Sequence, residues 1–79
     1  MTKLHASKIE GTDIQMLESE DGGYTVIGPL AQMVEAGYLD EADTSSLDEN
    51  KLVVIDMVDM YQVSDMEEAL RILEAEIEE

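Results

Sequence analysis

An excess of acidic residues is the feature that most restricts how this chain can fold. The 79 residues include 20 Asp and Glu but only 4 Lys and Arg, so the formal net charge is -16 at pH 7. An ordinary small domain has a net charge of magnitude about 2–8. Self-repulsion on this scale opposes a compact state, most strongly at low salt. Either something must compensate for this negative charge, or the protein must make use of it in its function.

The chain has enough apolar residues for one hydrophobic core. Leu, Ile and Val together number 20 of 79 residues, a fraction above that of highly charged chains that stay disordered. A chain this short buries only about 60% of the surface that it exposes when unfolded, so its stability is marginal. No internal repeat or linker is visible, and residues 1–79 are expected to form a single acidic domain.

The charge distribution indicates which partners are favoured. Residues 1–12 carry a net charge of +1, whereas residues 13–79 carry -17. Binding to nucleic acid or to an anionic membrane requires Lys and Arg to replace counterions, so we expect neither. A partner with a basic surface is favoured instead.

Other aspects of composition limit the class of protein. The chain has no Cys, which excludes disulfides and thiolate metal sites. No apolar stretch approaches the roughly 18–20 residues that span a membrane, and the N-terminus lacks the apolar core of a signal peptide. The expected location is the cytoplasm.

The first third of the chain has the pattern of a β-meander. Polar and apolar residues alternate over Lys3 to Ile9 and, more clearly, over Ile14 to Glu18. Asp21-Gly22-Gly23 then precedes the β-rich segment Tyr24 to Ile27, and Asp followed by Gly between two such runs favours a tight hairpin turn. The pattern predicts strands joined by a hairpin.

A short helix is predicted next. Pro29 suits the first position of a helix, because the N–H that it lacks would be unpaired there. Leu30, Met33 and Val34 share one helical face. Gly37 fits the position just past the helix end, where a left-handed conformation is common.

Residues 51–63 are open to two interpretations. The β-branched run over residues 53–55 favours a buried strand, whereas Ser46 followed by Glu49 resembles a helix-capping box. A strand over Leu52 to Met57 is preferred.

The C-terminal segment has the pattern of an amphipathic helix. Ser64 followed by Glu67 forms a capping box, and an apolar stripe comes after it. The pattern predicts a helix from Asp65 to Ile77, the longest of the chain. Its stripe consists of Met66, Leu70, Leu73 and Ile77.

Together these elements predict an α+β fold. A small antiparallel sheet, built from the N-terminal meander or hairpin and a strand near residues 52–57, is expected to pack against two helices.

The chain lacks the residues of common catalytic sites. His5 is the only His, and no Ser stands in a Gly-x-Ser-x-Gly turn, so the usual pairs of nucleophile and base cannot form. No phosphate-binding glycine loop is present either. We therefore expect a non-enzymatic protein without a cofactor.

The acidic segment over residues 40–50 has the oxygen ligands that calcium prefers. An EF-hand loop needs oxygen ligands at positions one, three and five and glycine at six. With Asp40 at position one, positions three, five and six hold Ala42, Thr44 and Ser45. The spacing does not match, so a solvated loop without a metal is expected.

The remaining candidate is the acidic surface itself. Carboxylates three or four residues apart on a helix lie about 5–6 Å from one another, and rows of this kind can imitate nucleic-acid phosphates. The residues that we expect to bind a partner are Asp40, Glu41, Asp43, Asp48 and Glu49 in the loop and Glu67, Glu68 and Glu74 on the C-terminal helix.

In size, charge and lack of catalytic residues, the chain is similar to small acidic proteins of phages and mobile elements. These include anti-CRISPR, anti-restriction and uracil-DNA glycosylase inhibitor proteins, and the likeness assigns a role to no individual residue. It implies an inhibitor that blocks a nucleic-acid-binding enzyme of host defence or repair by imitating nucleic-acid charge.

Two alternatives remain open. The chain could be an adaptor or a homodimer subunit that docks through an apolar helix face, either that of Leu30, Met33 and Val34 or the C-terminal stripe. It could also be an ordinary domain of a halophile, in which case the isolated chain would unfold below about molar salt.

Overall fold

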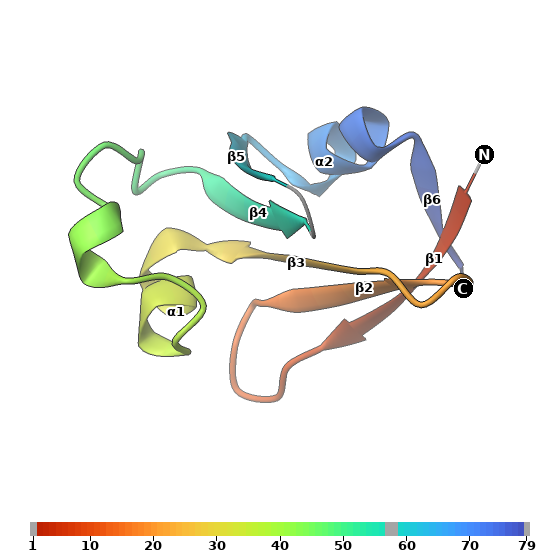
Figure 1. Cartoon of the computed structure of the whole chain (residues 1–79), viewed down its shortest axis with the longest axis horizontal. Coiled ribbons are helices and arrows are strands. Elements are labelled where there is room, and N and C mark those ends of the chain that lie inside the picture. Colours follow the sequence, from red (N-terminus) through yellow and green to blue (C-terminus); the bar gives the residue numbers. More distant parts are fainter. Residues whose placement is uncertain (1, 57–58, 79) are drawn as a thin grey trace.

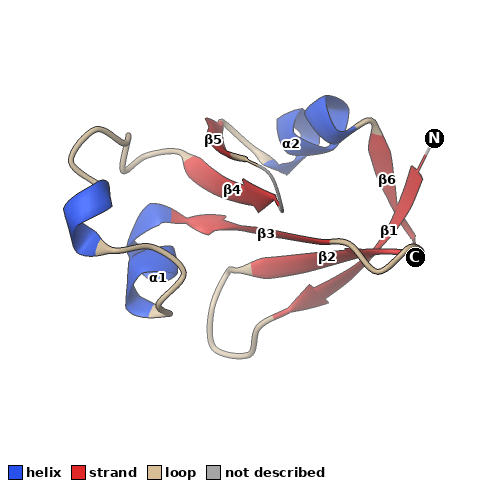
Figure 2. Ribbon diagram, in the orientation of Figure 1, coloured by secondary structure: helices blue, strands red, loops and turns tan. Residues whose placement is uncertain are grey.

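The computed structural model describes residues 2–56 and 59–78. They form a small α+β fold with a curled, mixed sheet and two helices (Figures 1 and 2). In chain order the elements are β1 (Thr2–Lys8), β2 (Gln15–Ser19), β3 (Tyr24–Pro29), α1 (Leu30–Glu35), the short 3-10 helix η1 (Glu41–Asp43), β4 (Leu52–Asp56), β5 (Met60–Val63), α2 (Met66–Leu73) and β6 (Ala75–Glu78).

The sheet has the strand order β5-β4-β3-β2-β1-β6. Neighbouring strands are antiparallel except β1 and β6, which are parallel, so the prediction of a purely antiparallel sheet is wrong. The reason is the connection through α2, which carries the chain from β5 at one edge of the sheet to β6 at the other. A crossover of this kind permits parallel pairing, which a tight hairpin cannot.

The N-terminal predictions are confirmed. The Asp21-Gly22-Gly23 turn joins β2 to β3, and Gly22 has a φ of 90°, where a side chain would be strained. The backbone N–H of Ser19 donates to the carbonyl of Gly23 at 2.9 Å and closes the turn. The predicted strand at residues 52–57 is confirmed as β4 as far as Asp56, while Met57 lies outside the described residues.

Each face of the sheet has its own hydrophobic cluster. The first cluster joins the sheet to α2, and the second lies beside α1 and the segment after it. Their buried members are Leu4, Leu17, Ile27, Val54, Val63, Ala69 and Ala75 in the first cluster and Ile14, Val26, Leu30, Met33 and Val53 in the second. Val53 and Val54 point to opposite faces, because successive side chains of a strand alternate.

Helix α1 begins one residue later than predicted. Pro29 ends β3 with an extended backbone (φ -62°, ψ 143°) and stands at the N-cap rather than at the first helical position. The helix end agrees with the prediction, since Gly37 has a φ of 89°. Leu30 and Met33 are buried in the second cluster, so the apolar face of α1 is occupied by the core.

The predicted helix from Asp65 to Ile77 is wrong in its last third. Helix α2 ends at Leu73, Glu74 turns the backbone into the left-handed region (φ 53°, ψ 47°), and β6 follows. Ala75 and Ile77 pair with Thr2 and Leu4 of β1, and both pack against the first cluster. Pairing with the free edge of β1 satisfies backbone groups that a fraying helix end would expose to water.

The helix cap is also displaced by one residue from the prediction. Asp65, not Ser64, is the N-cap, and its side chain accepts from the N–H of Glu68 at 2.8 Å. The N–H of Ser64 donates to Oε1 of Glu68 at 3.2 Å. Glu68 therefore takes the reciprocal role that the sequence pattern assigned to Glu67.

Glu74→Gly is expected to stabilise the fold by about 0.5–1 kcal/mol. A residue with a Cβ in the left-handed region costs about 1–2 kcal/mol, which outweighs the larger chain entropy that glycine loses on folding. Glu74→Ala is the matched control, because it removes the same charge and keeps the strain. Urea titration monitored by circular dichroism measures both variants, and equal midpoints for the two would contradict the prediction.

Candidate functional site: the acidic surface

The loop over residues 40–50 is an ordered structure. Leu39 and Leu47 are partly buried and pack against the second cluster, which ties the loop to the sheet at two points. Within the loop, the hydroxyl of Thr44 donates to the carbonyl of Glu41 at 2.7 Å. The five predicted binding residues of this segment are all exposed, and we call them the loop acids: Asp40, Glu41, Asp43, Asp48 and Glu49.

Gln62 of β5 holds the end of this loop. The backbone N–H of Asp48 donates to Oε1 of Gln62 at 3.0 Å, and Nε2 of Gln62 donates to the carbonyl of Asp48 at 2.7 Å. The N–H of Asn50 donates to Oδ1 of Asp48 at 2.9 Å, so this carboxylate has a local partner. Gln62 was not predicted as a site residue, and nothing in its sequence neighbourhood distinguishes it.

The predicted helical acids have different environments. Glu67 is exposed on α2, whereas Glu68 is half-buried and engaged in the helix cap. Glu74 is exposed but stands after the end of α2, where the chain turns into β6. Of these three residues, Glu67 and Glu74 present the more accessible carboxylates.

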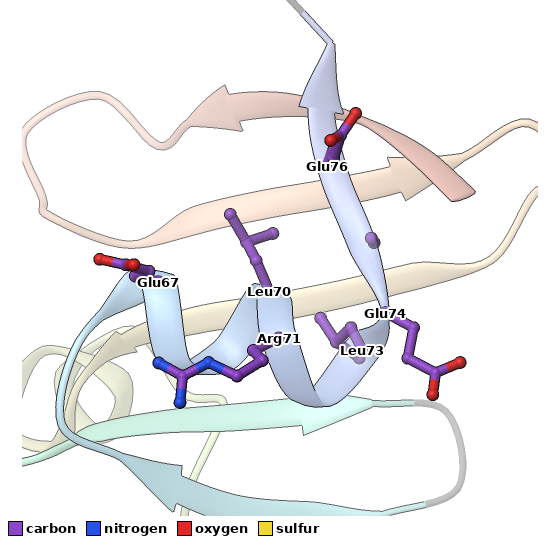
Figure 3. A pocket seen from close by; sticks show the side chains of 7 residues that line it. Glu67, Leu70, Arg71, Leu73, Glu74 and Glu76 are labelled. Carbon is purple, nitrogen blue, oxygen red and sulfur yellow. The ribbon is translucent and has the colours of Figure 1, made fainter. Parts of the chain in front are cut away.

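An open groove runs between α2 and β6 (Figure 3). Glu67 lies at the start of α2, Glu74 lies at the turn and Glu76 lies farther along β6, so carboxylates stand at several points around it. We call these three residues the groove acids. The groove is also lined by Leu70, Arg71, Leu73 and Ala75. Glu76 was not among the predicted binding residues.

The structure separates the predicted site into two regions. The loop acids lie at one end of the longest axis, and α2 and β6 lie toward the other end (Figure 1). The predicted binding residues therefore lie in two areas rather than in a single patch.

The carboxylates have few cationic neighbours within the chain. In residues 2–56 and 59–78, with Asp56 set aside, the one ion pair joins Nζ of Lys8 to Oδ1 of Asp13 at 3.6 Å, with both side chains well exposed. An exposed pair of this kind contributes about 0–1 kcal/mol. The 4 basic residues are already subtracted in the net charge of -16, so ion pairs within the chain neutralise none of this excess.

The linear charge density is close to that of nucleic acid. The Cα positions extend over 34 × 24 × 20 Å, which gives about one net negative charge per 2.1 Å of the longest axis. Duplex DNA has one charge per roughly 1.7 Å of its axis, and each of its strands has one per roughly 3.4 Å. The chain falls between these two values.

Tyr61 is a partly buried phenol that lies near two acidic residues. Its hydroxyl is buried and has no hydrogen-bond partner among the described residues. Burial raises the pKa of Tyr61 above its usual value, and the neighbouring charges of Asp56 and Asp59 raise this pKa further.

The described part of the chain has neither a metal-binding cluster nor a helix that could cross a membrane. No group of three or more His, Asp or Glu side chains is arranged there to hold a metal ion. The helices in this part are too short to cross a membrane.

Added salt is expected to stabilise the isolated chain. Screening shortens the reach of repulsion between exposed carboxylates from about 10 Å at about 0.1 M salt to about 3 Å at about 1 M. The urea midpoint should therefore rise steadily with NaCl, from a chain that is already folded at about 0.1 M. An unchanged midpoint would contradict this prediction, and a chain that is unfolded at about 0.1 M would favour the halophile alternative.

Comparison of the chain with protein-family models, with curated proteins and with solved structures found no match.

Proposed function

We propose that this chain is a non-enzymatic inhibitor that binds the basic nucleic-acid site of another protein. The expected target is an enzyme of host defence or repair, and the expected source is a phage or mobile element, as for the anti-CRISPR and anti-restriction proteins that it is similar to in kind. The observation that carries the proposal is the uncompensated charge, at about one negative charge per 2.1 Å of the molecule.

The ordered loop supports the proposal. A flexible acidic segment would lose conformational entropy on binding, whereas a loop held by Gln62 and by the second cluster loses less. The loop acids therefore present charge in a geometry that is already set. Electrostatic steering should raise the association rate about 10–1000-fold at low salt.

The docking faces considered in the adaptor alternative are used within the fold. Leu30 is 6% and Met33 is 0% exposed, and the α2 residues Met66, Leu70 and Leu73 pack against the first cluster. We therefore favour the acidic surface over these helix faces.

A competition experiment tests the proposal. The immobilised chain is used to capture proteins from a lysate at low salt, and those that elute with salt are purified and loaded with a labelled oligonucleotide. The chain is expected to displace the oligonucleotide, with an affinity that falls at least about 10-fold between about 50 and about 200 mM salt. Tight binding that is indifferent to salt and leaves the oligonucleotide in place would refute the proposal.

A further inference from the structure

A row of apolar side chains crosses four strands on the sheet face opposite α2. Met16 of β2 pairs with Val26 of β3, Val26 pairs with Ile55 of β4, and Ile55 pairs with Met60 of β5. Residues directly opposite each other in neighbouring strands share a face. Val26 and Ile55, in the middle of the row, belong to or pack against the second cluster, and Val26 is 8% exposed, whereas Met60 at the outer end of the row is 41% exposed.

Tyr24 extends this row along β3. It lies two residues before Val26, on the same face of the strand, and it is 49% exposed. We call Met16, Tyr24, Val26, Ile55 and Met60 the apolar row. Neither α1 nor α2 covers Tyr24 or Met60, which are two of the four large apolar residues that the described part of the chain exposes; the others are Tyr38 and Ile72.

Carboxylates lie beside the apolar row at both ends. Glu18 is exposed and stands opposite Tyr24 in β2. The loop acid Asp48 is held by Gln62, which lies two residues beyond Met60 on the same face of β5. A surface complementary to this one has apolar groups where it meets Tyr24 and Met60, and Lys or Arg beside them.

We infer that the apolar row, with its acidic border, fits a groove that binds single-stranded nucleic acid. Such grooves combine Lys and Arg, which follow the phosphates, with aromatic side chains on which bases stack. An inhibitor surface made only of carboxylates would pair with the basic residues of such a groove. It would leave the aromatic side chains of the groove without a partner. The exposed Tyr24 ring and the Met60 side chain supply apolar surface for those platforms.

Other occupants of this face fit less well. Sites for duplex DNA are dominated by contacts to phosphate and sugar, which give an apolar row little to pack against. A second copy of the chain would set a net charge of -16 against another of -16. The inference rests on the proposed function and narrows its partner to proteins that bind single strands.

The test uses two matched double variants of the full chain. Tyr24→Ser with Met60→Ser shortens the exposed part of the apolar row, and Tyr38→Ser with Ile72→Ser removes one Tyr and one aliphatic side chain elsewhere. Neither pair changes the charge. Circular dichroism confirms that all variants are folded before binding is compared.

The first probe is a single-strand-binding protein with an aromatic-lined OB-fold groove, loaded with fluorescent oligothymidine of about 15 nucleotides. The second is a helix-turn-helix protein loaded with a labelled duplex. The unmodified chain is expected to displace the oligothymidine more readily than the duplex. The double variant at Tyr24 and Met60 should displace the oligothymidine less strongly than the unmodified chain, by about 10-fold or more. The control double variant should differ from the unmodified chain by less than about 3-fold.

The outcomes separate this inference from the proposed function. Equal effects of the two variant pairs, or displacement of the duplex alone, would overturn the inference and leave the charge-based function standing. Failure to displace either nucleic acid at low salt would count against both. Displacement that depends on Tyr24 and Met60 but not on salt would overturn the charge-based function, and with it the inference that rests on that function.

Discussion

Reversing three loop acids together, by Asp40→Lys, Glu41→Lys and Asp43→Lys, should weaken binding to the basic partner by at least about 100-fold at low salt. The three residues are exposed on and beside η1, so the change converts three attractive contacts into repulsive ones. It also reduces the net negative charge of the chain, from -16 to -10. The salt dependence of the affinity should become shallower, because fewer counterions are exchanged on binding. Titration at about 50 and about 200 mM salt measures both effects.

The fold should tolerate this change. None of the three side chains is buried, and the hydrogen bond that the N–H of Asp43 donates to the carbonyl of Asp40 is made by the backbone. The urea midpoint is expected to stay level or to rise, because repulsion falls. If the urea midpoint of this variant fell well below that of the unmodified chain, the loss of binding would be due to unfolding and not to the reversed charges.

A variant with the same net charge tests whether position matters. Glu10→Lys, Glu20→Lys and Glu35→Lys also give -10, and all three residues are exposed outside the loop. We expect these changes to weaken binding by less than about 10-fold, mainly through slower association. If the two triple variants lose affinity equally, net charge alone governs binding and the loop acids are not the site.

The second large effect concerns Gly28, a buried residue of β3 on the sheet face that packs against α1. A Cβ at this position would lie 2.7 Å from Cγ1 of Ile14, 3.2 Å from Cα of Ile14 and 3.2 Å from Sδ of Met33. Ile14 and Met33 are both 0% exposed, so neither has free space to move into. Gly28→Ala is expected to destabilise the fold by about 1–3 kcal/mol, as overpacking of a core does.

This loss is large for a chain of this size, since a domain of 79 residues has a free energy of unfolding of about 4–12 kcal/mol. Urea denaturation of the single variants and of Ile14→Ala with Gly28→Ala measures it. In the double variant the space vacated by Ile14 should accept the new methyl group, so Gly28→Ala should add little further loss. Additive losses would show that the contact with Ile14 is not the cause.

The local elements of this fold could be predicted because their causes are local. The β2–β3 turn depends on a glycine that adopts a positive φ, and Gly22 stands at that position. In β4, Val53 and Val54 are buried on opposite faces, which accounts for the uninterrupted run of β-branched residues in the sequence. The end of α1 at Gly37 has the same kind of cause.

Elements that depend on distant partners could not be predicted in this way. The stripe that ends at Ile77 matches a helix in its spacing, but Ala75 and Ile77 also match one face of a strand. The edge of β1, more than seventy residues earlier, decides between the two by offering backbone hydrogen bonds. Strand β5 was missed, and its place at the sheet edge becomes apparent only from its pairing with β4.

The candidate site shows the same division. The sequence by itself determined the excess of carboxylates and the exposure of the loop acids, because charged residues without partners stay in water. Only the tertiary structure decided that the loop and groove acids lie in separate regions and that Gln62 holds the loop. The physical reason is that charge belongs to each residue, whereas the distance between charges depends on how strands far apart in the chain pair and how helices pack on them.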